Sequence, residues 1–212
     1  MLCAAAGGAH ALMPRQQAPA YKATAVVGEA FQRVDSESMK GSWQVLFFYP
    51  FDFTFVCPTE IVAFSNAVDD FAAINTKVVA VSTDSKFTHL QWVRTPRDQG
   101  GLGPVKLPLI ADVSKDISRA YGMLVEDPED ELYGAALRGV FIIDPQGTIR
   151  SITVNDEAVG RSVDEAMRIV KGFQYADEHG EGCPANWQPG AKTIVPDPDA
   201  SKKFFGEWSK EV

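Results

Sequence analysis

The chain has 212 residues, 45% of them hydrophobic, which is enough for one domain with its own core. Its formal net charge of −8, with no run of lysine or arginine, excludes the electrostatic footprint of a nucleic-acid-binding protein. No apolar stretch reaches the length of a membrane span, so neither nucleic acid nor a membrane is an expected partner.

Three cysteines, Cys3, Cys57 and Cys183, are too few and too scattered for a disulfide-rich secreted scaffold. With no C-x-x-C pair and only three histidines, a zinc site would need ligands from far-apart positions, so we expect no metal and no cofactor. A reducing, cytoplasmic location is the simplest expectation.

Residues 1–18 are rich in alanine and glycine and are predicted to form a flexible tail. This tail carries Arg15 and no acidic residue, so the alternative location is the mitochondrion or another organelle, if the segment is the remnant of a transit peptide. Tyr21–Val27 then reads as a strand, and the polar segment to Lys40 as a connection.

A buried strand and a helix start flank Cys57. Val45–Phe48 is an uninterrupted apolar run typical of a strand buried on both faces, and Pro50 ends it. Pro58 suits the first turn of a helix whose apolar face continues to Phe71. Cys57 is therefore expected within a residue or two of a helix N-terminus.

That position favours chemistry at Cys57. The unpaired amides and the dipole of a helix N-terminus stabilise negative charge, and the thiolate is the nucleophilic form of cysteine. The alternative is an inert structural thiol, packed among the aromatic side chains of Phe51, Phe53 and Phe55. The local sequence leaves both open.

The next elements alternate strands and helices. Lys77–Val81 is a predicted strand, a helix capped by residues 83–85 runs to Pro96, and Gly100–Gly103 reads as a surface turn. Leu107–Ile110 is a short apolar run, and a short helix capped by Ser114 follows.

The last third holds the clearest patterns. Leu137–Ile143 and Thr148–Val154 flank a turn sequence and predict a hairpin, with an acidic loop before it. Ser162–Glu165 is a capping box that opens a helix. Residues 176–212 form a proline- and glycine-rich arm with a short terminal helix near residues 202–209, too polar to fold alone.

The order β, α, β, α, α, β, β, α, with a parallel first half and a closing antiparallel hairpin, predicts an α/β fold. We expect a thioredoxin-like fold with a mixed central sheet flanked by helices and an extended C-terminal arm. The predicted domains are a flexible tail at 1–18, a thioredoxin-like domain at 19–175 and the arm at 176–212.

Several motifs resemble the typical 2-Cys peroxiredoxins of the AhpC/TSA-like family. Pro50, Thr54 and Cys57 fit the P-x-x-x-T-x-x-C motif of that family. The resemblance runs from about residue 19 to the C-terminus, through the string from Phe47 to Glu60 and the segments at 100–103, 138–144, 152–156, 159–165 and 179–187.

The resemblance implies the roles of the site residues. Cys57 would be the peroxidatic cysteine, Thr54 would hold thiolate and peroxide by its hydroxyl, and Pro50 would shield the pocket. Arg138 would supply positive charge and the N–H donors of its planar guanidinium, which point in fixed directions. Glu60 and Arg161 would support this site.

The resemblance also implies partners. Cys183 would be the resolving cysteine, acting on Cys57 of the partner subunit, which explains an arm unable to bury itself. The expected partners are a hydroperoxide substrate, thioredoxin or a similar dithiol reductant, and a homodimer that assembles to a decamer.

One departure from the family pattern concerns over-oxidation. The family's sensitive members have a C-terminal Tyr-Phe pair, where this chain has Phe204-Phe205. Without the hydroxyl the arm is expected to be held less tightly, so that disulfide formation is faster and over-oxidation slower.

Other functions of a reactive cysteine fit this sequence less well. A dithiol reductase needs C-x-x-C, and a cysteine hydrolase needs a histidine base that Arg138 cannot replace. An oligomeric thiol-based chaperone is the alternative that stays open.

Overall fold

The computed structural model describes residues 11–210, so Cys3 lies outside the described part. Contacts divide the chain into two units, one ending at Arg161 and one beginning at Ser162, which we describe separately. Between residues 11 and 210, no helix is both long and apolar enough to cross a membrane.

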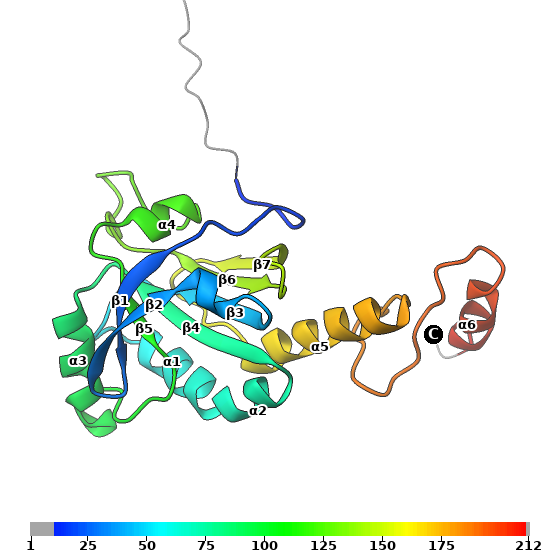
Figure 1. Ribbon diagram of the computed structural model, residues 1–212, viewed down its shortest axis with the longest axis horizontal. Helices are drawn as coiled ribbons and strands as arrows, with labels where there is room; N and C mark the ends of the chain where they lie inside the picture. The colour runs from blue at the N-terminus through cyan, green and yellow to red at the C-terminus, as the bar shows by residue number, and fades with distance from the viewer. Residues whose placement is uncertain (1–10, 211–212) are drawn as a thin grey trace, which may run out of the picture. The chain divides into compact units, whose positions relative to one another are not determined.

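The first unit is built on one mixed sheet of seven strands, in the order β2-β1-β5-β4-β3-β6-β7 (Figure 1). The strands are β1 (Lys22–Val27), β2 (Ala30–Asp35), β3 (Trp43–Phe48), β4 (Thr76–Ser82), β5 (Leu109–Ala111), β6 (Arg138–Ile143) and β7 (Ile149–Asn155). β3, β4 and β5 are parallel, and β6 and β7 form the predicted antiparallel hairpin. The expected mixed, thioredoxin-like sheet is confirmed.

Two predictions in the first part of the sheet are wrong. The segment expected to be a connection before Lys40 contains β2, which pairs with β1 along its whole length. β1 itself runs antiparallel to both β2 and β5, so the first half of the sheet is not wholly parallel. Four of the six β2 side chains are exposed because this strand lies at the sheet edge, and so it lacks the apolar pattern that marks a buried strand.

Four helices of the first unit cover the two faces of the sheet. They are α1 (Cys57–Asn66), α2 (Val68–Ala73), α3 (Lys86–Arg94) and α4 (Asp116–Ala120), with short 3-10 turns at Ser36–Met39 and Arg97–Gln99. α1, α2 and α3 lie on one face and α4 on the other (Figure 1). Right-handed crossovers explain this, because β3, β4 and β5 follow one another in a single direction across the sheet.

The helix predicted to run from Pro58 to Phe71 is two helices. It breaks at Ala67, whose N–H is shared among the carbonyls of residues 63, 64 and 65. Asp69 and Asp70 lie in the first turn of α2, where acidic side chains favour a new helix start. Both Phe64 and Phe71 are nevertheless fully buried, as the apolar spacing predicted.

The core is packed on both sides of β3, all six residues of which are buried as predicted. Phe48 contacts Tyr121 next to α4, with ring centroids 5.3 Å apart. Its neighbour Phe47 faces the other way and stacks on Phe64 of α1 at 4.5 Å. The strand that leads to Cys57 is therefore fixed from both faces.

The glycine-rich segment Gly100–Gly103 is not the surface turn that its composition suggested. Leu102 is fully buried, and a Cβ on Gly101 would lie 1.9 Å from the Thr95 carbonyl oxygen. The indole of Trp92 donates to the Gly100 carbonyl at 2.9 Å. The glycine content suggested a surface turn, but Gly101 is required because the backbone at Thr95 approaches it too closely for any Cβ.

The second unit contains α5 (Val163–His179) and α6 (Ser201–Trp208). The predicted helix start is confirmed, because the Ser162 hydroxyl accepts from the backbone N–H of Glu165 at 3.1 Å. The Glu165 carboxylate pairs with Arg168, so it is the serine half of the predicted capping box that the structure bears out. Between the helices, Gly182 and Ile194 exchange two backbone hydrogen bonds.

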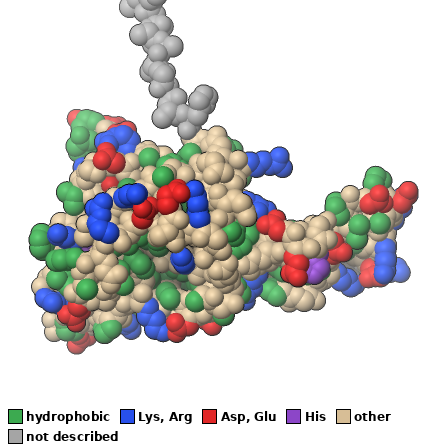
Figure 2. All heavy atoms as spheres, in the orientation of Figure 1, with side chains coloured by type: hydrophobic (Ala, Val, Ile, Leu, Met, Phe, Trp, Pro, Cys, Tyr) green, Lys and Arg blue, Asp and Glu red, His purple; other side chains and the backbone are tan. Residues whose placement is uncertain are grey.

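The described end of the N-terminal segment is hydrogen-bonded to the hairpin of the first unit. The Arg15 N–H donates to the Ile149 carbonyl at 2.8 Å, and the Ala18 N–H to the Gly147 carbonyl at 2.8 Å. Residues 1–10 of the predicted flexible tail lie outside the described part. On the visible face of the first unit, basic and acidic side chains are intermixed (Figure 2).

Candidate active site

Helix α1 begins at Cys57, with Pro58 in its first turn, as predicted. The Cys57 side chain is fully buried at this helix start. The Thr59 hydroxyl donates to the carbonyl of Val56 at 2.6 Å and tightens the first turn. The thiol therefore lies where backbone amides favour an anion.

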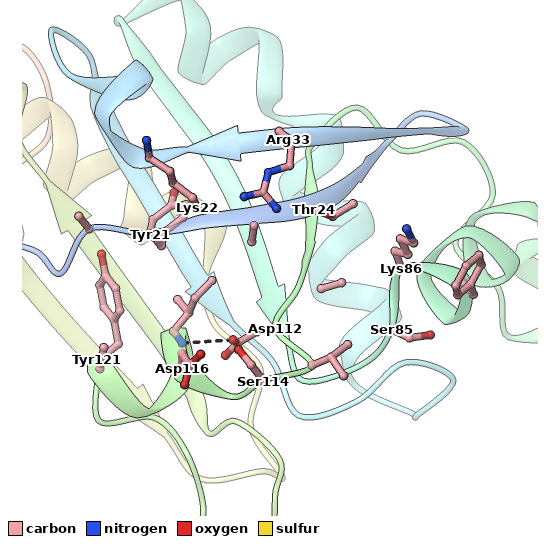
Figure 3. Close-up of a pocket in the computed structure, with 17 residues that line it drawn as sticks. Tyr21, Lys22, Thr24, Arg33, Ser85, Lys86, Asp112, Ser114, Asp116 and Tyr121 are labelled. Carbon is pink, nitrogen blue, oxygen red and sulfur yellow. Dashed lines mark hydrogen bonds between the residues drawn. The ribbon is translucent and has the colours of Figure 1, made fainter.

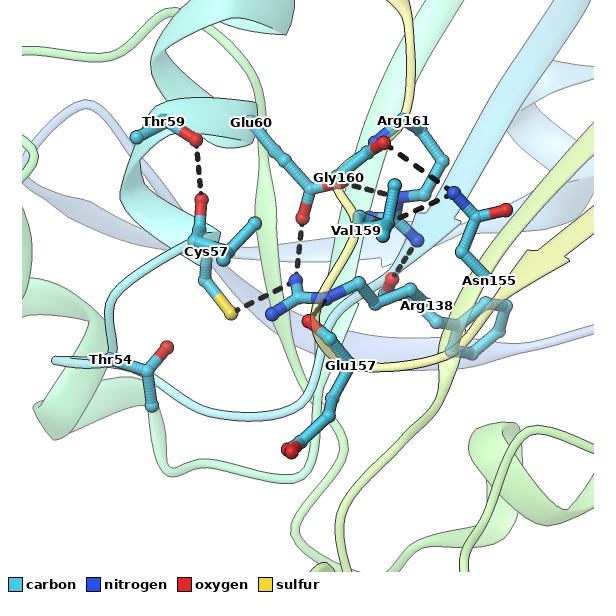
Figure 4. A network of polar contacts seen from close by, with 12 residues as sticks. Thr54, Cys57, Thr59, Glu60, Arg138, Asn155, Glu157, Val159, Gly160 and Arg161 are labelled. Atoms are coloured by element: carbon cyan, nitrogen blue, oxygen red, sulfur yellow. Dashed lines mark hydrogen bonds and ion pairs between the residues drawn. The ribbon is translucent and has the colours of Figure 1, made fainter.

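Arg138 reaches Cys57 from the first residue of β6 (Figure 4). Its Nη1 donates to Sγ of Cys57 at 3.4 Å and to Oε2 of Glu60 at 2.6 Å. Its Nε donates to the backbone carbonyl of Glu157, in the loop after β7. These contacts fix the guanidinium at three points, which a flexible lysine could not reproduce.

A second arginine approaches the same carboxylate. The Nε and the backbone N–H of Arg161 both donate to Oε1 of Glu60, at 2.6 and 2.7 Å. Its Nη1 donates to the carbonyl of Phe48 at the end of β3 at 2.7 Å. Burial lowers the pKa of Arg161, and the Glu60 carboxylate opposes that shift. Because a guanidinium is not deprotonated in proteins, Arg161 carries a positive charge.

The buried charges around Cys57 do not balance without it. The side chains of Arg138, Arg161 and Glu60 are 4%, 3% and 2% exposed, giving two positive charges and one negative. Uncompensated buried charge is strongly unfavourable, by several kcal/mol for one ion. Among the buried side-chain atoms of residues 11–210, Nη2 of Arg161 is one of two without a hydrogen-bond partner. A thiolate at Cys57 would supply the missing negative charge.

Pro50 and Thr54 lie in the loop between β3 and α1. Pro50 is buried, and Thr54 is partly buried. The Thr54 hydroxyl donates to the Phe51 carbonyl at 2.9 Å, which leaves its oxygen free to accept (Figure 4). The structure thus joins Cys57, Glu60, Arg138 and Arg161 in one network of contacts. Thr54 lies beside this network, in the loop before Cys57 (Figure 4), and Pro50 lies earlier in the same loop.

The aromatic packing that the alternative of an inert thiol at Cys57 required is not formed by Phe53 and Phe55. Phe55 is 94% exposed, and Phe53 is 47% exposed with its ring 5.8 Å from that of Trp92. Alternate residues of an irregular loop need not share a side, so their spacing does not imply such packing. The Cys57 sulfur contacts the guanidinium of Arg138.

Other residues near the site left no local sequence pattern. Tyr49 and Asp52, in the segment between β3 and α1, form a buried polar network with His89 of α3, although Asp52 and His89 are far apart in the sequence. Gly160 lies so close to the site that a Cβ there would be 3.3 Å from Cγ of Glu60. Only the topology brings these residues together.

Cys183 belongs to the second unit and is half-buried there. Its Sγ donates to the carbonyl of Gly172 in α5 at 3.5 Å. Burial raises the pKa of the Cys183 thiol, and the positive charge of Arg168 opposes that shift. The raised pKa favours the protonated form of this thiol, which is the less nucleophilic form.

A separate groove of the first unit is drawn in Figure 3. It has a volume of about 630 Å³ and is lined by residues in or next to β1, β2, β5, α4 and the start of α3, among them Tyr21, Arg33, Lys86 and Asp112. None of the predicted site residues lines it. The described residues also contain no cluster of three or more histidine, cysteine or carboxylate side chains that could hold a metal.

Comparison with known proteins identifies the family. Residues 14–152 match the AhpC/TSA family, and residues 172–207 match the C-terminal domain of 1-Cys peroxiredoxin. The chain is 57% identical to Peroxiredoxin-2 of Macaca fascicularis over 190 residues, which cover 90% of this chain and 93% of that protein. It is 53% identical to human Peroxiredoxin-4 over 188 residues, covering 89% of this chain and 68% of that protein.

Solved structures agree with this assignment. The reduced 2-Cys peroxiredoxin of Plasmodium vivax superposes with a TM-score of 0.86 at 39% identity, covering 91% of this chain and 98% of that one. The mitochondrial 2-Cys peroxiredoxin of Plasmodium falciparum gives a TM-score of 0.74 at 37% identity, over 81% of this chain and all of that one. These relatives favour a peroxidase over the chaperone alternative. The chain belongs to the AhpC/TSA family and is a peroxiredoxin, a thiol peroxidase that acts on hydroperoxides.

Proposed function

We propose that Cys57 is the peroxidatic cysteine and that hydrogen peroxide and organic hydroperoxides are its substrates. The observation that carries this proposal is the contact of 3.4 Å between Nη1 of Arg138 and Sγ of Cys57, within a buried cluster that has one excess positive charge. The thiolate sulfur attacks one peroxide oxygen, an S–O bond forms and the O–O bond breaks. Cys57 becomes a sulfenic acid, and the leaving oxygen takes a proton and departs as water or an alcohol.

The surrounding residues suit the transition state of this step. Negative charge moves from sulfur to the leaving oxygen, and Arg138, held at three points, offers N–H donors for it without reorganising. The Thr54 hydroxyl oxygen can accept the peroxide O–H. Glu60 and Arg161 orient Arg138, and Pro50 keeps water from the thiolate.

Cys183 resolves the sulfenic acid in this proposal. Its thiol attacks the Cys57 sulfur of the partner subunit, so that an S–S bond forms and water leaves. A dithiol reductant such as thioredoxin then reduces the disulfide and restores both thiols. A Plasmodium yoelii relative, 44% identical, is named thioredoxin peroxidase I, which supports this choice of reductant.

A homodimer supports the exchange between chains. β7 is an edge strand of the sheet, and Val154 on it is 45% exposed, so a second copy could pair there. The exposed rings of Phe55 and Phe87, 94% and 65% exposed, offer further apolar contacts for assembly to a decamer. Another Plasmodium yoelii relative, modified at its N-terminus, forms an octamer that is described as artifactual, so copies of that relative associate but this octamer does not give their natural number.

The cytoplasm is the location we propose, with the mitochondrion or another organelle as the alternative. The Plasmodium falciparum relative is a mitochondrial protein, and the tail at residues 1–18 carries no acidic residue. Imaging a fluorescent fusion with and without residues 1–18 distinguishes the two.

Peroxide consumption coupled to thioredoxin and its reductase tests the function. We expect the wild type to consume hydrogen peroxide, Cys57→Ser to lose the activity, and Cys183→Ser to complete one oxidation without recycling. Equal peroxide consumption by the wild type and Cys57→Ser would contradict the assignment.

A further inference from the structure

A buried polar network joins the loop that carries Cys57 to helix α3. Nδ1 of His89 lies 2.7 Å from Oδ2 of Asp52, and both side chains are 0% exposed. The Tyr49 hydroxyl donates to Oδ1 of Asp52 at 2.8 Å and also lies 3.5 Å from Nδ1 of His89. No step of the proposed reaction uses these three side chains.

The carbonyl of Ile110 determines the hydrogen-bond roles in this network. A carbonyl oxygen only accepts, so Nε2 of His89, which lies 3.2 Å from it, carries a hydrogen. The contact between His89 and Asp52 then needs one more proton, held on either side chain. Burial alone would lower the pKa of His89, but the hydrogen bond and charge of Asp52 outweigh it and raise that pKa. Burial likewise raises the pKa of Asp52, so the pair keeps the shared proton.

The residue after Asp52 is held in an unfavourable backbone conformation. Phe53 has a φ of 54°, in the left-handed region that bulky L-residues rarely adopt. The loop is held at Asp52 and at Phe53: the Asp52 N–H donates to Oδ2 of Asp84 at 2.9 Å, and the Phe53 ring packs against Trp92 of α3. The backbone strain favours release of the loop, and the contacts to Asp84 and to α3 oppose it.

Release of this loop decides the fate of oxidised Cys57. While Cys57 stays buried beside Arg138, its sulfenic acid can meet a second hydroperoxide, which transfers one oxygen to give sulfinic acid and leaves as water or alcohol. To form the disulfide with Cys183 it must leave, because a disulfide needs Cα atoms within about 7 Å. The balance between the two conformations therefore sets the balance between the two products.

We propose that His89, acting through Asp52 and Tyr49, is a positioning residue that holds the Cys57 loop in its folded conformation and so sets the partition between sulfinic acid and disulfide. The proposal rests on the proposed function of Cys57 and Cys183. The three side chains of this network would then act on the reaction indirectly, through the conformation of the loop.

The test measures the fraction of Cys57 converted to sulfinic acid per turnover, by mass spectrometry, during recycling by thioredoxin at a fixed hydrogen peroxide concentration. In His89→Leu we expect this fraction to fall about tenfold, because losing a hydrogen bond to a charged group shifts a two-state equilibrium by about that factor. Tyr49→Phe removes one O–H and keeps the ring, so we expect a fall of about threefold. Gln91→Ala, on the exposed side of α3, is the matched control and should leave the fraction unchanged.

Asp52→Asn separates hydrogen bonding from simple packing damage. The amide can donate to unprotonated Nδ1 of a neutral His89 and accept from Tyr49, so every bond is kept without the shared proton. We expect this variant to stay within about twofold of the wild type, whereas Asp52→Ala should fall like His89→Leu.

The outcomes are distinct. If Tyr49→Phe and His89→Leu consume peroxide with an unchanged or larger sulfinic fraction, the proposal is overturned. If His89→Leu does not fold, Tyr49→Phe and Asp52→Asn still decide it, and an Asp52→Asn fraction as low as that of Asp52→Ala also overturns it. A wild type that consumes no peroxide contradicts the proposed function instead.

Discussion

Arg138 links the electrostatics of the candidate site to its geometry. One of its nitrogens contacts both the Cys57 sulfur and the Glu60 carboxylate, while Nε is fixed by a backbone carbonyl. The positive charge could be supplied by lysine, but the fixed directions of the donors could not. Substitutions at Arg138 can therefore separate the effect of charge from that of direction.

We expect Arg138→Lys to slow the oxidation of Cys57 by hydrogen peroxide about 10²-fold and Arg138→Met about 10³-fold, the range found when a preorganised donor is removed. Stopped-flow fluorescence under single turnover measures the rate. Arg94→Lys, at an exposed ion pair with Glu29, is the matched control and should keep the wild-type rate. A wild-type rate in Arg138→Lys would contradict the role given to the guanidinium fork.

At the scale of elements, α6 is the part of the arm that departs from the family pattern. Phe204 is half-buried, with its ring 5.6 Å from that of the more exposed Phe205. Both rings line a groove of about 520 Å³ with Trp187 and Trp208. The missing hydroxyl removes one possible hydrogen bond that would hold this helix.

We expect Phe204→Tyr to raise the sulfinic fraction of Cys57 about fivefold, since one added hydrogen bond contributes about 1 kcal/mol. Phe205→Tyr adds the same hydroxyl at the neighbouring, exposed position and should change little. Mass spectrometry of the Cys57 peptide after repeated turnover makes the comparison. Equal sulfinic fractions in Phe204→Tyr and the wild type would rule out a role for this hydroxyl.

The elements that could be predicted from the sequence are those whose burial leaves a pattern. An apolar run predicted β3, and turn residues between two apolar runs predicted the hairpin of β6 and β7. A capping sequence predicted the helix start at Ser162, and a proline predicted the helix start at Cys57. β2 was missed because an edge strand lacks an apolar pattern, and the interruption at Ala67 because both halves keep the same buried face. Residues of the network at His89 were missed because only the folded chain brings them together.

The candidate site shows the same division. Pro50, Thr54 and Cys57 share a short motif, so the sequence could point to them directly. Their meeting with Arg138 and Arg161 follows from strand order, since β6 lies beside β3 in the sheet. Periodicity and composition do not show that an arginine will contact Cys57 or Glu60. The roles of Arg138 and Arg161 were therefore expected from the family resemblance.

At the scale of the whole molecule, each catalytic cycle is proposed to require two chains. Cys57 lies at a helix start in the first unit and Cys183 in the second, and each is proposed to react with its counterpart on a partner chain. Neither chain could then complete the cycle alone. Mixing two variants, each of which lacks one of the cysteines, can test this requirement.

The most direct test mixes Cys57→Ser chains with Cys183→Ser chains, reduced and allowed to exchange subunits, and then adds one equivalent of hydrogen peroxide. Each variant alone should give no disulfide-linked dimer on a non-reducing gel. The mixture should give one, and peptide mapping should show Cys57 of one chain joined to Cys183 of the other. A linked dimer in either variant alone, or none in a mixture that exchanges subunits, would contradict the proposed cycle.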